Sequence, residues 1–197
     1  QIGSSAVCGL ELSPDGSRLF AMCRGASAVE MRDARSDGLP VLATLSFEAN
    51  EGYGICRLVC SETLVVAAGG AYMGRPSDAR SRSACVWRLD DLEEAEPVTL
   101  EFGSDANAVA LRPGCEAELA VGTGDGAVRI FASCLDSADD GGRVVDVGDG
   151  SAVNSLAYSP DGSLLAFGGE PKACVKIFEA GTGEELRSVL YRKGEIA

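Results

Sequence analysis

A pentapeptide that occurs twice constrains this chain more than any other feature. The sequence SPDGS stands at 13–17 and again at 159–163. Both copies have large, mostly apolar neighbours at the same positions, with Leu12 or Tyr158 directly before the pentapeptide and Leu19 or Leu165 shortly after it. In such a segment proline fixes φ, aspartate caps its own backbone and glycine supplies a positive φ, so the chain reverses. We therefore expect antiparallel strand pairs that belong to an internal repeat.

Two degenerate copies of the repeat lie between the SPDGS segments. Equivalent anchors spaced 46, 53 and 47 residues apart are Leu12, Leu58, Leu111 and Tyr158. A second set, in which each residue ends a short strand-like run, is Met31, Trp87, Phe131 and Phe178. The repeats span approximately 6–50, 51–104, 105–149 and 150–191, and we assign 1–197 to one domain or part of one domain.

Each repeat holds four short strand-like runs separated by turn-forming residues. The second run of three repeats is apolar on both faces, at 64–68, 119–121 and 164–167. That pattern indicates a sheet buried on both sides, as when sheets stack on one another. A stacked four-stranded unit of this length is a β-propeller blade. The predicted fold class is therefore all-β, a β-propeller with about four antiparallel blades.

Two segments carry a resemblance to the WD-repeat (WD40) family. Residues 153–166 look like the first half of such a repeat, and residues 121–131 look like the second half, with Asp125 at the family's b–c turn aspartate. The first repeat resembles equally well a blade of the bacterial YVTN-type propellers, through 13–21. The WD-repeat resemblance implies a β-propeller that binds other proteins.

The chain departs from the WD-repeat pattern in its polar residues. It contains no histidine, and Trp87 is followed by Arg88 rather than by aspartate. The family's hydrogen-bond set of histidine, serine or threonine, aspartate and tryptophan therefore cannot form. We expect packing and backbone hydrogen bonds alone to hold these blades.

Four blades are fewer than the resemblance implies, since WD-repeat propellers usually close with seven. The first repeat begins at an innermost strand and the last ends at an outermost strand, which leaves no extra strand for closure. Three interpretations remain open: part of a longer propeller, a ring completed by another chain or a second copy, and a closed four-bladed ring. Apolar faces on the first and last blades are expected to favour association.

Composition excludes several function classes. With 17 Lys and Arg against 30 Asp and Glu, the net charge is −13, which disfavours binding to nucleic acid. The absence of histidine removes Ser-His-Asp and Cys-His nucleophiles and histidine-containing metal sites. No apolar run is long enough to span a bilayer, so we expect no membrane insertion. We expect no catalysis, cofactor or metal.

The eight cysteines form no C-x-x-C pair, and most lie in apolar runs. Buried cysteine behaves as a small hydrophobic residue. We expect reduced thiols rather than disulfides or a metal site, which favours the cytoplasm or another reducing compartment.

An insertion at 71–83 accounts for the longest spacing between repeats and clusters arginines in an acidic chain. Its candidate partner-binding residues, of types enriched at interface cores, are Tyr72, Met73, Arg75, Arg80 and Arg82. They favour an acidic or phosphate-bearing protein partner. The alternative is a surface hairpin whose arginines only maintain solubility. Two acidic stretches, 90–94 and 136–140, are interpreted as solvated loops, since neither has the spacing of a calcium loop.

The predicted function is a WD40-repeat scaffold for protein–protein interaction, a non-catalytic subunit or module of a larger assembly. One alternative is a YVTN-type or lactonase-like propeller enzyme that uses carboxylates or a divalent ion. A second is a WD-repeat protein associated with actin and the cytoskeleton.

Overall fold

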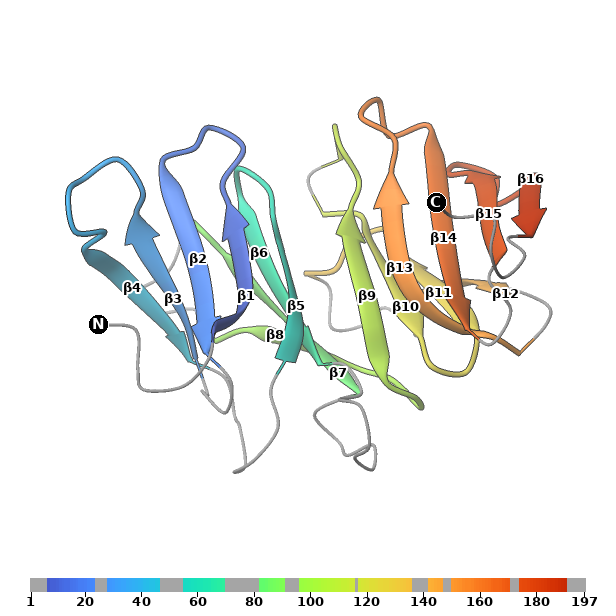
Figure 1. The fold of residues 1–197 in the computed structure, drawn as a ribbon, viewed down its shortest axis with the longest axis horizontal. Coiled ribbons are helices and arrows are strands. Elements are labelled where there is room, and N and C mark those ends of the chain that lie inside the picture. The colour runs from blue at the N-terminus through green and yellow to red at the C-terminus, as the bar shows by residue number, and fades with distance from the viewer. Residues whose placement is uncertain are drawn as a thin grey trace. The chain divides into compact units, whose positions relative to one another are not determined.

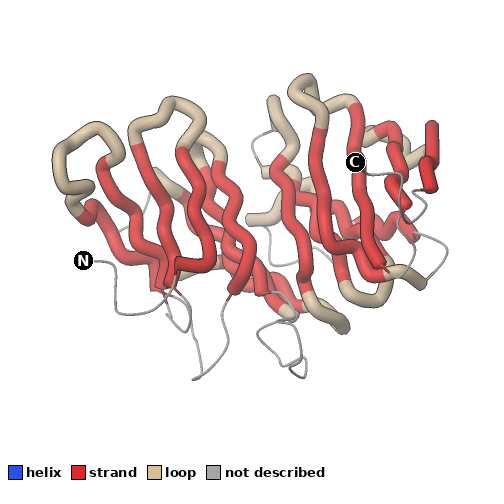
Figure 2. Tube along the Cα trace, in the orientation of Figure 1, coloured by secondary structure: helices blue, strands red, loops and turns tan. Residues whose placement is uncertain are grey.

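The computed structural model describes residues 7–23, 28–46, 55–69, 82–90, 96–115, 117–135, 142–146, 150–170 and 174–190. Within these ranges all regular secondary structure is β-strand (Figure 2). The sixteen strands form four separate sheets, each an antiparallel meander of four consecutive strands (Figure 1). The predicted all-β fold with about four four-stranded blades is confirmed.

The blades are numbered in chain order. The first comprises β1 (Val7–Leu12), β2 (Arg18–Cys23), β3 (Ala28–Asp33) and β4 (Val41–Ser46). The second comprises β5 (Ile55–Cys60), β6 (Leu64–Gly69), β7 (Ser83–Arg88) and β8 (Val98–Glu101). The third comprises β9 (Ala106–Leu111), β10 (Leu119–Thr123), β11 (Ala127–Phe131) and β12 (Arg143–Asp146). The fourth comprises β13 (Ala152–Tyr158), β14 (Leu164–Glu170), β15 (Cys174–Glu179) and β16 (Glu185–Leu190).

The chain divides into two compact units, which we call the N-terminal unit (1–105) and the C-terminal unit (106–197). Each unit contains two blades stacked face to face around one apolar core. In the N-terminal unit the core joins Phe20 and Met31 of the first blade to Val65 and Trp87 of the second. In the C-terminal unit the core joins the third and fourth blades through Ala120, Val128, Ile130, Val145, Val153, Leu165, Phe167 and Phe178. This stacking covers one face of each second strand, such as Val65 and Ala67 on β6. β6 and β10 are buried along their whole length, whereas in β14 buried and less buried residues alternate, so the expected burial of both faces at 164–167 was wrong.

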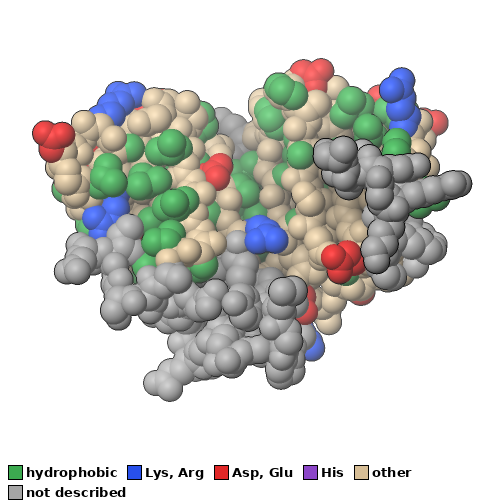
Figure 3. Space-filling view, viewed as in Figure 1, with side chains coloured by type: hydrophobic (Ala, Val, Ile, Leu, Met, Phe, Trp, Pro, Cys, Tyr) green, Lys and Arg blue, Asp and Glu red, His purple; other side chains and the backbone are tan. Residues whose placement is uncertain are grey.

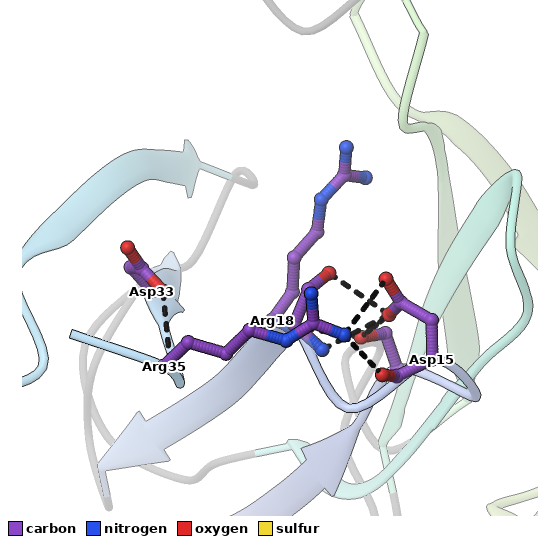
Figure 4. Close-up of polar contacts among 6 residues, drawn as sticks. Asp15, Arg18, Asp33 and Arg35 are labelled. Carbon is purple, nitrogen blue, oxygen red and sulfur yellow. Dashed lines mark hydrogen bonds and ion pairs between the residues drawn. The ribbon is translucent and has the colours of Figure 1, made fainter.

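The SPDGS segments form the predicted turns. In the first copy the Asp15 carboxylate accepts hydrogen bonds from the Ser13 hydroxyl at 2.6 Å and from the Ser17 backbone N–H at 3.0 Å (Figure 4). Gly16 has φ +69°, which only glycine adopts readily. The second copy repeats both contacts through Asp161, at 2.5 Å and 3.1 Å. The Ser159 hydroxyl and the Ser163 N–H lower the pKa of Asp161 to about 2, so this carboxylate is a turn element that is ionised at neutral pH.

One backbone hydrogen bond closes the turn between the first two strands of every blade. Its donor N–H and acceptor C=O are Ser13 and Arg18, Ser61 and Leu64, Arg112 and Glu118, and Ser159 and Leu164, at 2.9–3.0 Å. The residues before the donors are therefore equivalent: Leu12, Cys60, Leu111 and Tyr158. The predicted anchor Leu58 was wrong by two residues, because the second turn lacks proline and glycine. The corrected spacings are 48, 51 and 47 residues.

Candidate partner-binding surface

Each blade has two edges of different construction. At one edge, which we call the turn edge, the first strand turns into the second and the third continues into the fourth. At the other edge, which we call the bulge edge, the first strand begins and the second connects to the third. The turn edge is closed by its own hydrogen bonds: Arg35, for example, donates to the backbone carbonyl of Asp15 at 2.7 Å (Figure 4).

The bulge edge takes its name from an irregularity that occurs in all four blades. Near the start of each first strand the pairing with the second strand skips one residue, which is a β-bulge. The skipped residues are Cys8, Cys56, Asn107 and Asn154. A bulge redirects a side chain and interrupts the regular ladder, and such features commonly mark functional positions. The sequence interpretation missed these residues, although each lies five residues before the first residue of its turn.

The bulged residues differ between the two units. In the C-terminal unit the Asn107 side-chain amide donates to the Asn154 side-chain oxygen at 3.2 Å, across the third and fourth blades. In the N-terminal unit the Cys8 thiol donates to the Met22 carbonyl at 3.6 Å, while the side chain of Cys56 lies outside the described residues. The C-terminal unit therefore presents two amides at this edge, which can both donate and accept hydrogen bonds.

The arginine-bearing insertion connects β6 to β7 in the sequence, and the end of β6 and the start of β7 lie at the bulge edge of the second blade. Of the five predicted partner-binding residues, Tyr72, Met73, Arg75 and Arg80 lie outside the described residues. Arg82 is described and exposed, directly before β7. Its backbone carbonyl accepts a hydrogen bond from the Phe102 N–H at 2.7 Å, which anchors the base of the insertion to the end of the blade. The role of these five residues stays a prediction.

Polar contacts join the third and fourth blades, so the expectation that packing and backbone ladders alone hold the blades was wrong. The Arg112 guanidinium donates to the Gly162 carbonyl at 2.7 Å and to the Glu118 carboxylate at 3.2 Å. The Tyr158 hydroxyl donates to the same carboxylate at 3.1 Å. Burial, and then the Glu118 charge, raise the pKa of Tyr158 well above its usual range. The hydrogen-bonding groups of Arg112, Glu118 and Tyr158 are thus paired with one another, and they hold the third and fourth blades together.

The seven described cysteines are free thiols. Burial, and then the charges of Glu11 and Glu62, raise the pKa of Cys60 to about 12. Burial raises the pKa of Cys134 to about 11, and burial also raises that of Cys85. Because the thiolate is the reactive form of cysteine, these three side chains are poor nucleophiles at neutral pH.

The thiols should therefore react at very different rates with an alkylating reagent at pH 8. Cys60 and Cys134 are expected to stay unmodified, since their raised pKa values leave roughly one thiolate in a thousand or fewer. Cys115, which is exposed to solvent, is expected to be alkylated during the same reaction time. Mass spectrometry of the digested protein resolves each site, and early labelling of Cys60 or Cys134 in folded protein would contradict this assignment.

In the sequence, the two acidic stretches come between the third and fourth strands of their blades. Of these residues only Asp90 is described, and it forms an ion pair with Arg88 at 2.9 Å. Among the residues that the structure describes, no three Cys, Asp or Glu side chains gather as a metal-ligand group. The same residues include no helix long and apolar enough to cross a membrane. Enzyme, metal and cofactor status stay predictions.

Comparison with known proteins supports the fold alone. No protein-family model matches the sequence, and no curated protein is similar to it. A chain in the crystal structure of a mitotic checkpoint complex is 23% identical, with a TM-score of 0.70 over 93% of this chain and 52% of that chain. A chain of Kuenenia stuttgartiensis hydrazine synthase is 15% identical, with a TM-score of 0.70 over 94% of this chain and 49% of that one. The protein thus spans about half the length of these two chains, and its fold is that of propeller-type blades.

Proposed function

We propose that this protein is a WD-repeat-like scaffold for protein–protein interaction, a non-catalytic module of a larger assembly. The observation that most supports this proposal is the β-bulge at the same place in the first strand of every blade. The bulged residues are Cys8, Cys56, Asn107 and Asn154. A bulge leaves an unpaired residue on an otherwise regular scaffold. Rigid blades that hold such irregular positions and variable loops along one edge suit partner binding.

The insertion in the second blade adds to this proposal, because the two strands that it connects in sequence, β6 and β7, join at the same edge. Its arginines favour an acidic or phosphate-bearing protein segment in a chain whose net charge is −13. The similar chain from the mitotic checkpoint complex is part of a multiprotein complex, which is compatible with a scaffold. Hydrazine synthase is an enzyme by its name, so the likeness itself does not favour either class.

The chemistry of the described residues favours binding over catalysis. The thiols of Cys60, which is half-buried, and of Cys134, which is buried, are held protonated. The Glu118 carboxylate is engaged by Arg112 and Tyr158. Free thiols also favour a reducing compartment such as the cytoplasm. No described feature favours the lactonase-like or the cytoskeletal alternative.

Affinity capture with a matched control tests the proposal. The triple variant Arg75→Ala, Arg80→Ala, Arg82→Ala and the double variant Asn107→Ala, Asn154→Ala are expected to lose partners that the unmodified chain retains, by tenfold or more in recovered amount. The control Arg35→Ala, Arg88→Ala removes two exposed arginines at the turn edge and is expected to retain them. Quantitative mass spectrometry provides the readout. Equal recovery by all variants would mean that the bulge edge does not bind partners.

A further inference from the structure

One face of the fourth blade repeats a face that is buried inside the C-terminal unit. We call the face that a blade turns toward the next blade in the chain its forward face, and the opposite one its rear face. Two cross-strand rows of the third blade's forward face read Ala110, Ala120, Ile130, Arg143 and Ala108, Gly122, Val128, Val145. The same rows of the fourth blade read Ala157, Ala166, Ile177, Arg187 and Ser155, Gly168, Val175, Val189. Seven of the eight residues are identical.

In the third blade this face forms the interface with the fourth blade. Ala120 and Val128 are fully buried there. Val153 of the fourth blade packs so closely over Gly122 that a Cβ at this position would collide with it. At the rim of the face, the Arg143 guanidinium crosses to the fourth blade and donates to the Ala180 carbonyl at 2.7 Å. Each of these features depends on residues that the fourth blade repeats.

In the fourth blade the same residues are open to solvent to a larger degree. Val189 is 48% exposed where its counterpart Val145 is 9% exposed. Ser155 is exposed where its counterpart Ala108 is 3% exposed. The forward face of the fourth blade thus carries the residues that the third blade uses in its interface with the fourth. The surface that would match it is the rear face of a blade resembling the fourth.

The rear face of the first blade meets that description. Four residues of the fourth blade that contact the third blade have identical counterparts in the first blade. The pairs are Val153 and Val7, Leu156 and Leu10, Leu165 and Leu19, and Ala180 and Ala34. Tyr158 corresponds to Leu12. The counterparts on the first strand are exposed, Val7 by 45%, Leu10 by 58% and Leu12 by 56%. Hydrophobic side chains are visible at the surface of both units in Figure 3.

The two rear faces also differ, and the differences lie on the second and third strands. Ala21 and Arg32 of the first blade replace Phe167 and Phe178, while Glu30 replaces Lys176. The Arg32 guanidinium is buried and pairs with the Glu30 carboxylate at 2.6 Å, so the charged pair is neutralised within its own blade. The apolar first strand and Leu19 remain as the matching surface.

We infer that the chain associates head to tail with a second copy of itself, the forward face of the fourth blade covering the rear face of the first blade of its partner. This deepens the proposed scaffold function and rests on it, because the assembly is then the form that presents the bulge edges. The contact is heterologous, with different surfaces on the two sides, so it propagates unless the assembly closes. It covers Val7, Leu10 and Val189 in the way that Val153, Leu156 and Val145 are covered within one chain, where Val153 and Val145 are buried and Leu156 is partly buried.

Single substitutions on either face test the inference by sedimentation at several concentrations. The unmodified chain is expected to sediment at two or more times its 20.3 kDa mass. Val189→Asp and Leu10→Asp, each at an exposed position, are each expected to sediment as single chains. The control Leu190→Asp alters a 68% exposed leucine on the opposite face of the same strand and is expected to associate as the unmodified chain does. Circular dichroism establishes that each variant is folded.

An equimolar mixture of the two variants distinguishes this contact from a symmetric one. Each variant keeps one intact face, so the mixture is expected to form heterodimers even though neither variant associates alone. A single-chain mass for the unmodified protein up to about 100 μM would overturn the inference, as would a mixture that stays monomeric. Continued association of Val189→Asp alone would overturn it as well. If a strictly monomeric chain still captured partners at the bulge edge, this inference would be wrong, but the proposed scaffold function would be unaffected.

Discussion

Truncation of Phe167 to alanine is expected to lower the free energy of unfolding of the C-terminal unit by about 3–5 kcal/mol. Phe167 is 3% exposed on β14, and its ring stacks on that of Phe178 with centroids 4.9 Å apart. Removing it leaves a cavity in the core that joins the third and fourth blades. Chemical denaturation followed by far-UV circular dichroism measures the loss.

The single tryptophan supplies a control within the same experiment. Trp87 lies in the core of the N-terminal unit, so its fluorescence reports on that unit while circular dichroism reports on both. The Leu190→Ala variant, at a 68% exposed position on β16 and outside the proposed contact, is expected to change stability by no more than about 0.5 kcal/mol. A loss below about 1 kcal/mol for Phe167→Ala would mean that the two blades are not packed as described.

Substitution of Gly122 by alanine is expected to cost about 1–3 kcal/mol, as overpacking of a filled interface does. An added Cβ would collide with a methyl group of Val153 and approach Leu156 Cδ1 to 3.3 Å. Alanine normally stabilises a strand relative to glycine because it restricts the unfolded chain. The predicted sign is therefore opposite to the usual effect of this substitution.

A compensating substitution makes the Gly122 prediction specific. In a Val153→Ala background the colliding methyl group is absent, and the contacts that remain are with the Cβ of residue 153 at 3.0 Å and with Leu156 Cδ1 at 3.3 Å. The added cost of Gly122→Ala should therefore fall, which corresponds to a coupling of about 1 kcal/mol. Gly181 is the control, because nothing lies within 4 Å of a Cβ built there. Additive effects of the Gly122 and Val153 substitutions would show that the two residues do not meet.

The repeat architecture could be predicted from the sequence because it depends on local chemistry. Proline, aspartate and glycine in SPDGS carry their own turn conformation, and both copies fold as expected around Asp15 and Asp161. The second turn has no such residues, and the anchor was therefore placed at Leu58 rather than Cys60. That error hid the alignment of the four bulged residues, which becomes visible once the turns are matched by their hydrogen bonds.

Contacts between blades could not be read from the sequence in the same way. Arg112 and Glu118 lie in one turn, but their partners Gly162 and Tyr158 come from a different blade, and only the stacking of blades brings them together. The repetition of one blade face on another was present in the sequence, yet its meaning depends on knowing which residues of the third blade are buried. The predicted arginine-bearing loop lies almost entirely outside the described residues, so its role rests on residue type and position.

Site-specific photo-crosslinking tests most directly whether the protein binds partners through the bulge edge of its blades. A photo-reactive residue is placed at Arg82 on the bulge edge or at Asp37 on the turn edge, both exposed positions in the N-terminal unit. We expect position 82 to crosslink to a captured partner and position 37 not to crosslink. Crosslinks from position 37 with none from position 82 would contradict this expectation.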